Sequence, residues 1–210
     1  MIKILISDDH AIVREGLKQS LADTEDLVVG GEAANGHEVL ELIRQEDWDM
    51  VLLDLAMPGK DGLETLKELK KEKPKLPVLV LSIYPEEQYA VRALKAGASG
   101  YLTKESAPGE LIAAIRKVSQ GGKYISASLA EKLASHLVAD ADRPVHEFLS
   151  DREFQVMLLI ASGKTVKEIA DEMYLSVKTV STYRVRALSK LGMKNNSEFT
   201  YYAIKQGLIK

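Results

Sequence analysis

Short apolar runs alternate with amphipathic stretches over the first 120 residues of the chain. Five runs rich in Val, Ile and Leu have the length of β-strands, and the segments between them have helical apolar spacing. Because parallel strands need crossover connections, this alternation predicts an α/β domain with a parallel sheet covered on both faces. The predicted strands are Ile2–Ser7, Leu27–Ala33, Met50–Leu53, Pro77–Leu81 and Ser99–Leu102, and the predicted helices are His10–Ala22, His37–Gln45, Leu63–Lys71, Glu86–Ala96 and Pro108–Gly121.

The pattern loosens over residues 122–147, which we interpret as a linker. Three leucines there have the spacing of one short amphipathic helix, and the turn-rich stretch ADADRPVHE follows them. The three leucines are Leu129, Leu133 and Leu137.

Every signal over residues 148–210 is helical. Ser150 with Glu153, and Thr165 with Glu168, fit the capping box, in which a hydroxyl and a carboxylate satisfy exposed backbone donors. Glycines stand where helix C-termini favour a left-handed residue, at Gly163, Gly192 and Gly207. The sequence therefore predicts an all-α domain of four helices, at about 151–162, 166–173, 177–191 and 198–206.

Charge separates the two ends of the chain. The net charge is −3, but residues 1–147 carry 18 Lys and Arg against 25 Asp and Glu, whereas residues 148–210 carry 10 against 6. An acidic module and a module that faces nucleic acid are typical of such a split. The absence of cysteine excludes disulfides and thiolate metal sites. No leader and no apolar run of about 20 residues is present, so we expect a cytoplasmic protein without membrane contact.

Polar side chains follow four of the five predicted strands. Asp8 and Asp9 follow the first strand, Asp54 the third, Ser82 the fourth and Lys104 the fifth. Sites in open α/β sheets form beyond the carboxyl ends of the strands, so these side chains should lie together. Crowded carboxylates raise one another's pKa unless a cation is present, and oxygen-only ligation suits Mg²⁺. Lys104 adds a positive charge that can pair with an anion such as phosphate.

Each of these residues also has an ordinary structural explanation. Asp8 and Asp9 fit as N-caps of the following helix, and Asp54 fits a turn at the end of a strand. Ser82 and Lys104 carry little information singly. The joint pattern at four strand ends is what favours a functional site.

The segments ISDDH, LLDLAMPGKDG, LVLS and GASGYLTK, in this order, resemble the receiver domain of two-component response regulators over about residues 1–121. The resemblance implies a flavodoxin-like, doubly wound five-stranded sheet. It implies that Asp54 is the phosphoacceptor for a sensor histidine kinase. It further implies that Asp9, Asp54 and the backbone carbonyl of Ala56 hold Mg²⁺, with Asp8 acting through water.

The same resemblance implies a switch. Ser82 would move to hydrogen-bond the phosphoryl group, and Tyr101 would swing inward behind it. Lys104 would neutralise the phosphoryl oxygens together with Mg²⁺. The modification would thereby bias the face around the fourth helix and the fifth strand.

Two other classes of protein are disfavoured. Phosphatases that pass through a phosphoaspartate have an acid two residues after the nucleophile, and this chain has Ala56 there. We therefore expect no enzyme, only the receiver's own phosphotransfer and autodephosphorylation. A dinucleotide-binding protein needs glycines directly after the first strand, which ISDDH lacks, and GGEAANG comes too late with the wrong spacing.

Two capped helices joined by a short turn at Met173–Ser176 predict a helix-turn-helix, whose second helix enters the major groove of DNA. Its core face should contain Val177, Val180, Leu188 and Leu191, with Tyr183 and Ala187 on or near it. The candidates for DNA contact are Lys178, Thr179, Ser181, Thr182, Arg184, Val185 and Arg186. Arg184 and Thr182 are the candidates to read base edges. Taken alone, the basic residues of this helix are also explained by an amphipathic helix whose polar face is exposed to solvent.

The segment from LSDRE through KEIA to KTVSTYR resembles the four-helix DNA-binding domain shared by NarL/FixJ and LuxR-type regulators, over roughly residues 148–210. Several relatives have a polar or basic residue in the place of Val185, so the family's specificity is not carried over there. The two resemblances imply a phosphorylation-dependent transcription regulator that binds promoter DNA as a homodimer. The alternative is a phosphorylation-independent DNA-binding regulator with a degenerate receiver, and the intact set of receiver residues argues against it.

Overall fold

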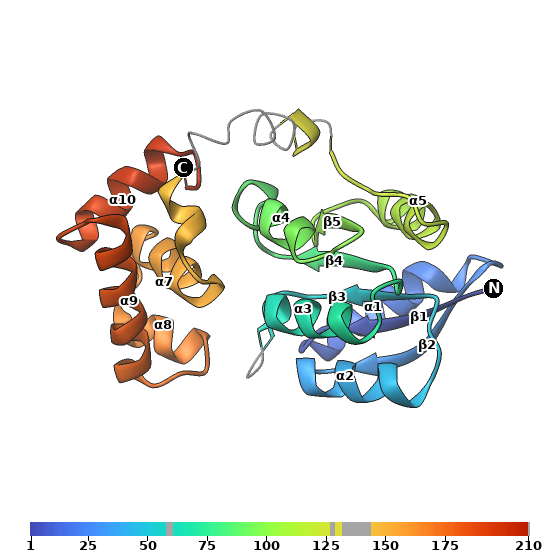
Figure 1. Ribbon diagram of the computed structural model, residues 1–210. Coiled ribbons are helices and arrows are strands. Elements are labelled where there is room, and N and C mark those ends of the chain that lie inside the picture. The colour runs from blue at the N-terminus through green and yellow to red at the C-terminus, as the bar shows by residue number, and fades with distance from the viewer. Residues whose placement is uncertain (58–60, 127–128, 132–143, 210) are drawn as a thin grey trace. The chain divides into compact units, whose positions relative to one another are not determined.

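The computed structural model describes the chain in two compact units. Figure 1 colours the chain by residue number. Each unit has a buried core of its own. None of the helices within the described ranges combines the length and hydropathy that a membrane span needs. The units are Met1–Glu131 and Lys132–Lys210, and the described residues are 1–57, 61–126, 129–131 and 144–209.

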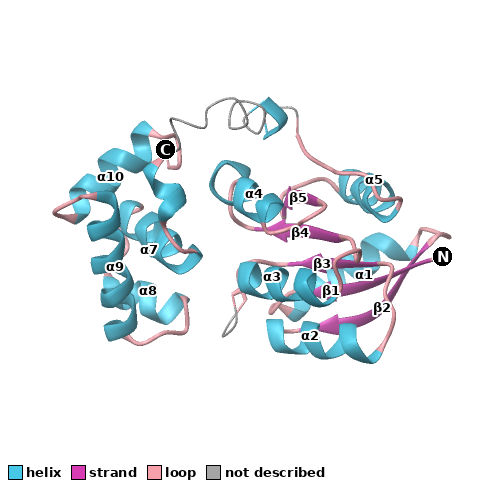
Figure 2. Ribbon diagram, viewed as in Figure 1, coloured by secondary structure: helices cyan, strands magenta, loops and turns pink. Residues whose placement is uncertain are grey.

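The first unit contains a five-stranded parallel sheet. Its strands are β1 (Ile2–Ser7), β2 (Leu27–Ala33), β3 (Met50–Leu53), β4 (Val78–Ser82) and β5 (Gly100–Thr103). They lie side by side in the order β2-β1-β3-β4-β5, so the connections reverse direction at β1 (Figure 2). This is the doubly wound α/β arrangement that the sequence predicts.

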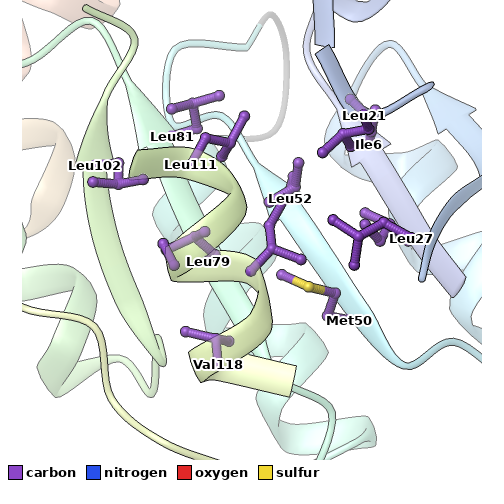
Figure 3. Close-up of a cluster of buried hydrophobic side chains, with 13 residues drawn as sticks. Ile6, Leu21, Leu27, Met50, Leu52, Leu79, Leu81, Leu102, Leu111 and Val118 are labelled. Atoms are coloured by element: carbon purple, nitrogen blue, oxygen red, sulfur yellow. The ribbon is translucent and has the colours of Figure 1, made fainter. Parts of the chain in front are cut away.

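Five helices make the connections and cover the sheet. They are α1 (Ala11–Ala22), α2 (Gly36–Gln45), α3 (Gly62–Glu72), α4 (Glu86–Lys95) and α5 (Pro108–Ser119). Leu111 and Val118 of α5 project toward Leu52 and Leu79 of the central strands, with Leu21 of α1 in the same cluster (Figure 3). The central strands β3 and β4 are almost entirely apolar because helices bury both faces of the sheet there.

The carboxyl edge of the sheet differs slightly from the predicted one. Strands β4 and β5 each begin and end one residue later than expected, so Ser82 is the last residue of β4. The helix that was expected to begin at His37 begins at Gly36, because the side chain of Asn35 accepts a hydrogen bond from the Glu38 amide at 3.0 Å.

The segment after α5 packs against the free edge of β5. Tyr124 forms an isolated parallel bridge with Gly100, and its amide donates to the Ser99 carbonyl at 2.9 Å. Residues 129–131 are helical, and Leu129 is buried. The remaining leucines of the predicted short helix, Leu133 and Leu137, lie outside the described residues.

The second unit is helical, as predicted. Both capping boxes are confirmed, and the three predicted glycines have φ values of 91°, 67° and 65°. The last helix begins two residues earlier than predicted, because the side chain of Asn195 accepts from the Glu198 amide. The elements are the 3₁₀ helix η1 (Val145–Phe148), α7 (Asp151–Ala161), α8 (Val166–Glu172), α9 (Val177–Leu191) and α10 (Asn196–Lys205).

The prediction that Val177 faces the core is wrong. Val180 and Ala187 of α9 are fully buried, whereas Val177 is 51% exposed. Val177 is the first residue of the helix, and a helical side chain lies over the turn that precedes its own Cα. No helical turn precedes Val177, so its side chain projects beyond the packed part of α9.

Candidate functional site

Three charged side chains meet at the carboxyl edge of the parallel sheet. The Lys104 ammonium lies 2.5 Å from Asp8 Oδ2 and 2.7 Å from Asp54 Oδ2. Strand β1 delivers Asp8, β3 delivers Asp54 and β5 delivers Lys104, because parallel strands end at the same edge. The two carboxylates are only 1% and 2% exposed. One lysine thus bridges two buried acids.

Backbone donors fix the orientation of both carboxylates. Asp8 Oδ1 accepts from the amide of His10 at 2.9 Å, and Asp54 Oδ1 accepts from the amide of Ala56 at 3.1 Å. Asp8 therefore closes a turn before α1, and the N-cap residue of α1 is His10, which makes no side-chain capping bond. The capping explanation for Asp8 and Asp9 does not describe this structure.

Burial and neighbouring charge shift the pKa values of Asp54 and Lys104 in opposite directions. Burial raises the pKa of Asp54 above its usual value, and the contact with Lys104 offsets only part of that rise. Burial would lower the pKa of Lys104, but the carboxylates of Asp54 and Asp8 outweigh it and raise that pKa. The lysine is therefore charged, and Asp54 remains short of the positive charge that a buried carboxylate needs.

Asp9, the neighbour of Asp8 in the chain, has a buried carboxylate oxygen that accepts no hydrogen bond. Among the described residues, Asp9 Oδ1 is the one buried side-chain nitrogen or oxygen without a hydrogen-bond partner. It lies 2.8 Å from Nδ1 of the exposed His10, which forms an ion pair when protonated. Possible ligand atoms of Asp8, Asp9 and His10 lie within 4.8 Å of one another. The chemistry of these oxygens suits a hard cation.

Ser82 and Tyr101 are joined through the loop between β4 and α4. The Ser82 hydroxyl oxygen accepts from the Tyr84 amide at 3.2 Å, and the Tyr101 hydroxyl donates to the Tyr84 carbonyl at 2.8 Å. Tyr101 is 2% exposed, so its ring already points inward. Burial raises the pKa of Tyr101, which keeps its hydroxyl a donor. The amide of Lys104 donates to the Ser82 carbonyl, which ties the serine to the lysine.

Sequence reasoning missed two contacts at this edge of the sheet. The guanidinium of Arg14 donates to the Asp8 carbonyl at 2.7 Å, and Ser7 donates to the sulfur of Met57 at 3.0 Å. Arg14 lies one helical turn after His10, and this spacing could have predicted that its side chain lies near the end of β1. No comparable signal marks Met57, because its contact depends on how the loop after β3 folds back.

The second unit presents α8 and α9 joined by a tight turn. Ser176 caps α9 by accepting from the Thr179 amide at 3.0 Å. Tyr174 has a φ of 54°, the one positive value at a non-glycine residue within the described ranges. Lys190 of α9 contacts the buried Glu153 of α7 at 2.6 Å, which fixes the helix against the domain.

The candidate DNA contacts occupy different sides of α9. An open hollow of about 240 Å³ is lined by Lys178, Thr179, Thr182, Tyr183 and Arg186. Arg184 instead lies at the edge of the core, where its Nε donates to Asn196 Oδ1 of α10 at 2.6 Å. Val185 is exposed and Ser181 is half-buried. The sequence did not predict that Arg184 is held by α10.

Known protein families match both units. The family described as "Response regulator receiver domain" matches residues 4–116, and the family described as "Bacterial regulatory proteins, luxR family" matches residues 147–203. The first match contains the lysine–carboxylate cluster, and the second runs from the end of η1 into α10.

Similar proteins extend over the whole length of the chain. It is 37% identical to the response regulator UvrY of Escherichia coli (strain K12) over 209 residues, which are 99% of this chain and 96% of that protein. It is 40% identical to the response regulator GacA of Pseudomonas aeruginosa over 211 residues, covering 100% of this chain and 98% of that protein.

Solved structures of the response regulator RcsB are also similar. RcsB of Salmonella typhimurium matches with a TM-score of 0.69 at 28% identity over 98% of each chain. RcsB of Salmonella enterica serovar Typhimurium, bound to promoter rprA in the presence of phosphomimetic BeF3⁻, matches with a TM-score of 0.65 at 29% identity. That match covers 96% of this chain and 98% of the other. Since both domains and the full-length relatives agree, the chain belongs to the two-component response regulators of the NarL/FixJ family.

Proposed function

We propose that this response regulator accepts a phosphoryl group on Asp54 from a sensor histidine kinase and then binds promoter DNA as a homodimer. The observation that carries the proposal is the contact of Lys104 with the buried carboxylates of Asp8 and Asp54. RcsB structures with promoter DNA and phosphomimetic, and of RcsB dimers on DNA, support the same partners here. We assign the receiver to 1–121, the linker to 122–147 and the DNA-binding domain to 148–210, acting in the cytoplasm.

Phosphoryl transfer follows from the charges around Asp54. A carboxylate oxygen forms a bond to phosphorus while the bond from phosphorus to the kinase histidine breaks, and the histidine nitrogen keeps the electron pair. The approach of two anions needs positive charge at fixed positions, which Lys104 supplies from the β5 side. No acid stands at Ala56 to protonate the leaving group of an outside substrate. The regulator therefore carries only its own phosphotransfer and slow autodephosphorylation.

The acids fit Mg²⁺ as the cofactor. The buried oxygen of Asp9, which accepts no hydrogen bond, and the incompletely compensated charge of Asp54 both favour a divalent cation with oxygen ligands. Asp9, Asp54 and the backbone carbonyl of Ala56 would hold the ion, with Asp8 acting through water. Bound there, Mg²⁺ supplies positive charge against the phosphoryl oxygens.

The switch residues connect Asp54 to the α4–β5 face. A phosphoryl group on Asp54 would attract the Ser82 hydroxyl, which now accepts from the Tyr84 amide. The carbonyl of Tyr84 also receives the Tyr101 hydroxyl, so a change at Ser82 alters the support of Tyr101. Phosphorylation thereby biases two arrangements of the same loop and strand.

The helix α9 is proposed to lie in the major groove of DNA. Its cationic and hydroxyl side chains would position it on the phosphates, and the most exposed ones would reach base edges. A dimer would present two such helices to paired half-sites. The residues assigned to DNA contact are Lys178, Thr179, Ser181, Thr182, Arg184, Val185 and Arg186.

Intact mass spectrometry after incubation with Mg²⁺ and acetyl phosphate tests the phosphoacceptor. We expect the mass of one phosphoryl group on the wild type, none on Asp54→Asn, and none on Asp9→Asn. Asp47→Asn, which changes a fully exposed acid near α2, is the matched control and should label like the wild type. An unlabelled wild type, or equal labelling of Asp54→Asn, contradicts the proposal.

Salt-dependent DNA binding tests the second domain. Neutralised phosphates release counterions, so affinity should fall steeply with salt, and Arg186→Ala should reduce the slope by about one unit. Lys205→Ala, an exposed lysine in the last turn of α10, is the control and should keep the slope. An affinity that does not respond to salt would refute the assignment of α9.

A further inference from the structure

Val185 is an exposed aliphatic side chain within the DNA-facing helix. It is 58% exposed and stands in sequence between two arginines. A single exposed valine is ordinary on a protein surface, so it is the position of Val185 on the helix that matters. The fold gains little from a valine there, because most of the side chain stays in water.

The exposed residues of α9 form one stripe along the helix. Lys178, Thr182, Val185 and Ser189 follow one another at spacings of four, three and four residues, and all four are exposed. Residues at these spacings lie above one another on a helix. Val180 and Ala187, which are fully buried, mark the opposite side. The stripe is therefore the part of α9 that reaches deepest into a groove.

The polar residues around Val185 are already engaged or better suited to phosphates. The Thr182 hydroxyl donates to the Lys178 carbonyl at 2.9 Å, and Arg184 is held by Asn196. Lys178 and Arg186 both line the same hollow and supply positive charge to it. Positive charge beside the exposed stripe suits the major groove, where phosphate backbones flank the base edges.

The base edges of the major groove offer one apolar group, the 5-methyl of thymine. We propose that Val185 reads this methyl group in each half-site and so sets a preference for a T·A pair. The inference deepens the proposed DNA binding and rests on it. It assigns base specificity to an exposed aliphatic side chain at the centre of the outward stripe of α9.

The test removes only the methyl group from the DNA. A binding site is first selected from a random duplex library with the wild-type protein, and each conserved thymine is then replaced singly by deoxyuridine. Burial of one methyl contributes about 0.8 kcal/mol, so wild-type affinity should fall about fourfold at one thymine per half-site. Val185→Ala should bind both duplexes equally. Val177→Ala, a similarly exposed valine eight residues earlier, should keep the fourfold loss.

The outcomes separate this inference from the proposed function. A wild type that binds no duplex in a salt-dependent manner refutes the DNA-binding proposal and the role of Val185 with it. A wild type that binds but does not respond to deoxyuridine overturns the inference alone. So does an equal loss in Val185→Ala, or a loss that disappears in Val177→Ala. A change of oligomeric state in Val185→Ala with the methyl effect retained would place Val185 in a protein interface instead.

Discussion

Replacing Lys104 by Met removes one charge from the acid cluster and keeps the length of the side chain. The ammonium now contacts Asp8 and Asp54 at 2.5 and 2.7 Å, and both acids are buried. Breaking a buried ion pair by removing one partner typically costs 3–5 kcal/mol, because the remaining charge stays buried without compensation. The Lys104 side chain is 13% exposed, so solvent screens little of this loss. We expect the receiver to lose about 3 kcal/mol of unfolding free energy without Mg²⁺.

The loss can be measured on the full chain by urea unfolding. Trp48 is the single tryptophan of the sequence and lies between α2 and β3, so its fluorescence reports the receiver. If Mg²⁺ binds only the folded receiver, it should raise the unfolding free energy by about 1.4 kcal/mol for each tenfold excess over its dissociation constant. Lys73→Met, which removes an exposed lysine 3.8 Å from an exposed acid, should change stability by less than about 0.5 kcal/mol. A loss below about 1 kcal/mol for Lys104→Met, or no recovery with Mg²⁺, would show that Lys104 does not compensate the two buried acids.

Three further predictions concern packing and charge elsewhere. Leu52→Ala should cost about 3 kcal/mol in the Trp48 unfolding assay, because the side chain is 1% exposed in the receiver core; a loss under 1 kcal/mol would contradict that burial. Gly100→Ala would place a Cβ 2.7 Å from the Tyr124 carbonyl, so we expect faster amide exchange of residue 124, and unchanged exchange would argue against the bridge. Burial raises the pKa of Glu153, but hydrogen bonds from Lys190 and Ser150 outweigh it and leave the pKa below 4.5. The stabilisation by ionised Glu153 is thus present above pH 4.5 and is lost as the pH falls through the lowered pKa. In calorimetry, Glu153→Gln should therefore lower the unfolding free energy by about 1 kcal/mol at pH 7 and by little at acidic pH. A loss of unfolding free energy that does not depend on pH would contradict this.

The arrangement of strands and helices was predictable because apolar spacing reports burial directly. The ends of elements were less predictable, since they depend on individual side chains. The helix α10 begins at Asn196 because Asn195 caps it, and η1 spans the predicted end of the linker, where no apolar period marks it. Val177 has the apolar character of a core residue but stands at a helix end, where burial is lost.

The gathering of Asp8, Asp54 and Lys104 followed from topology alone, because parallel strands share one carboxyl edge. The sequence could not give the contacts within that cluster. That Lys104 reaches two acids, and that Asp9 keeps a buried oxygen without a hydrogen bond, depends on rotamers and on the turn before α1. The bond from Arg184 to Asn196 depends likewise on how α9 and α10 approach each other.

The central claim is that phosphorylation of Asp54 controls DNA binding. The most direct measurement is the affinity of the full-length protein for its selected duplex, before and after treatment with acetyl phosphate and Mg²⁺, with phosphoryl content weighed in the same sample. We expect affinity to rise with the phosphorylated fraction of the wild type and to stay constant for Asp54→Asn. Equal affinity of phosphorylated and unphosphorylated protein, or the same rise in Asp54→Asn, would contradict it.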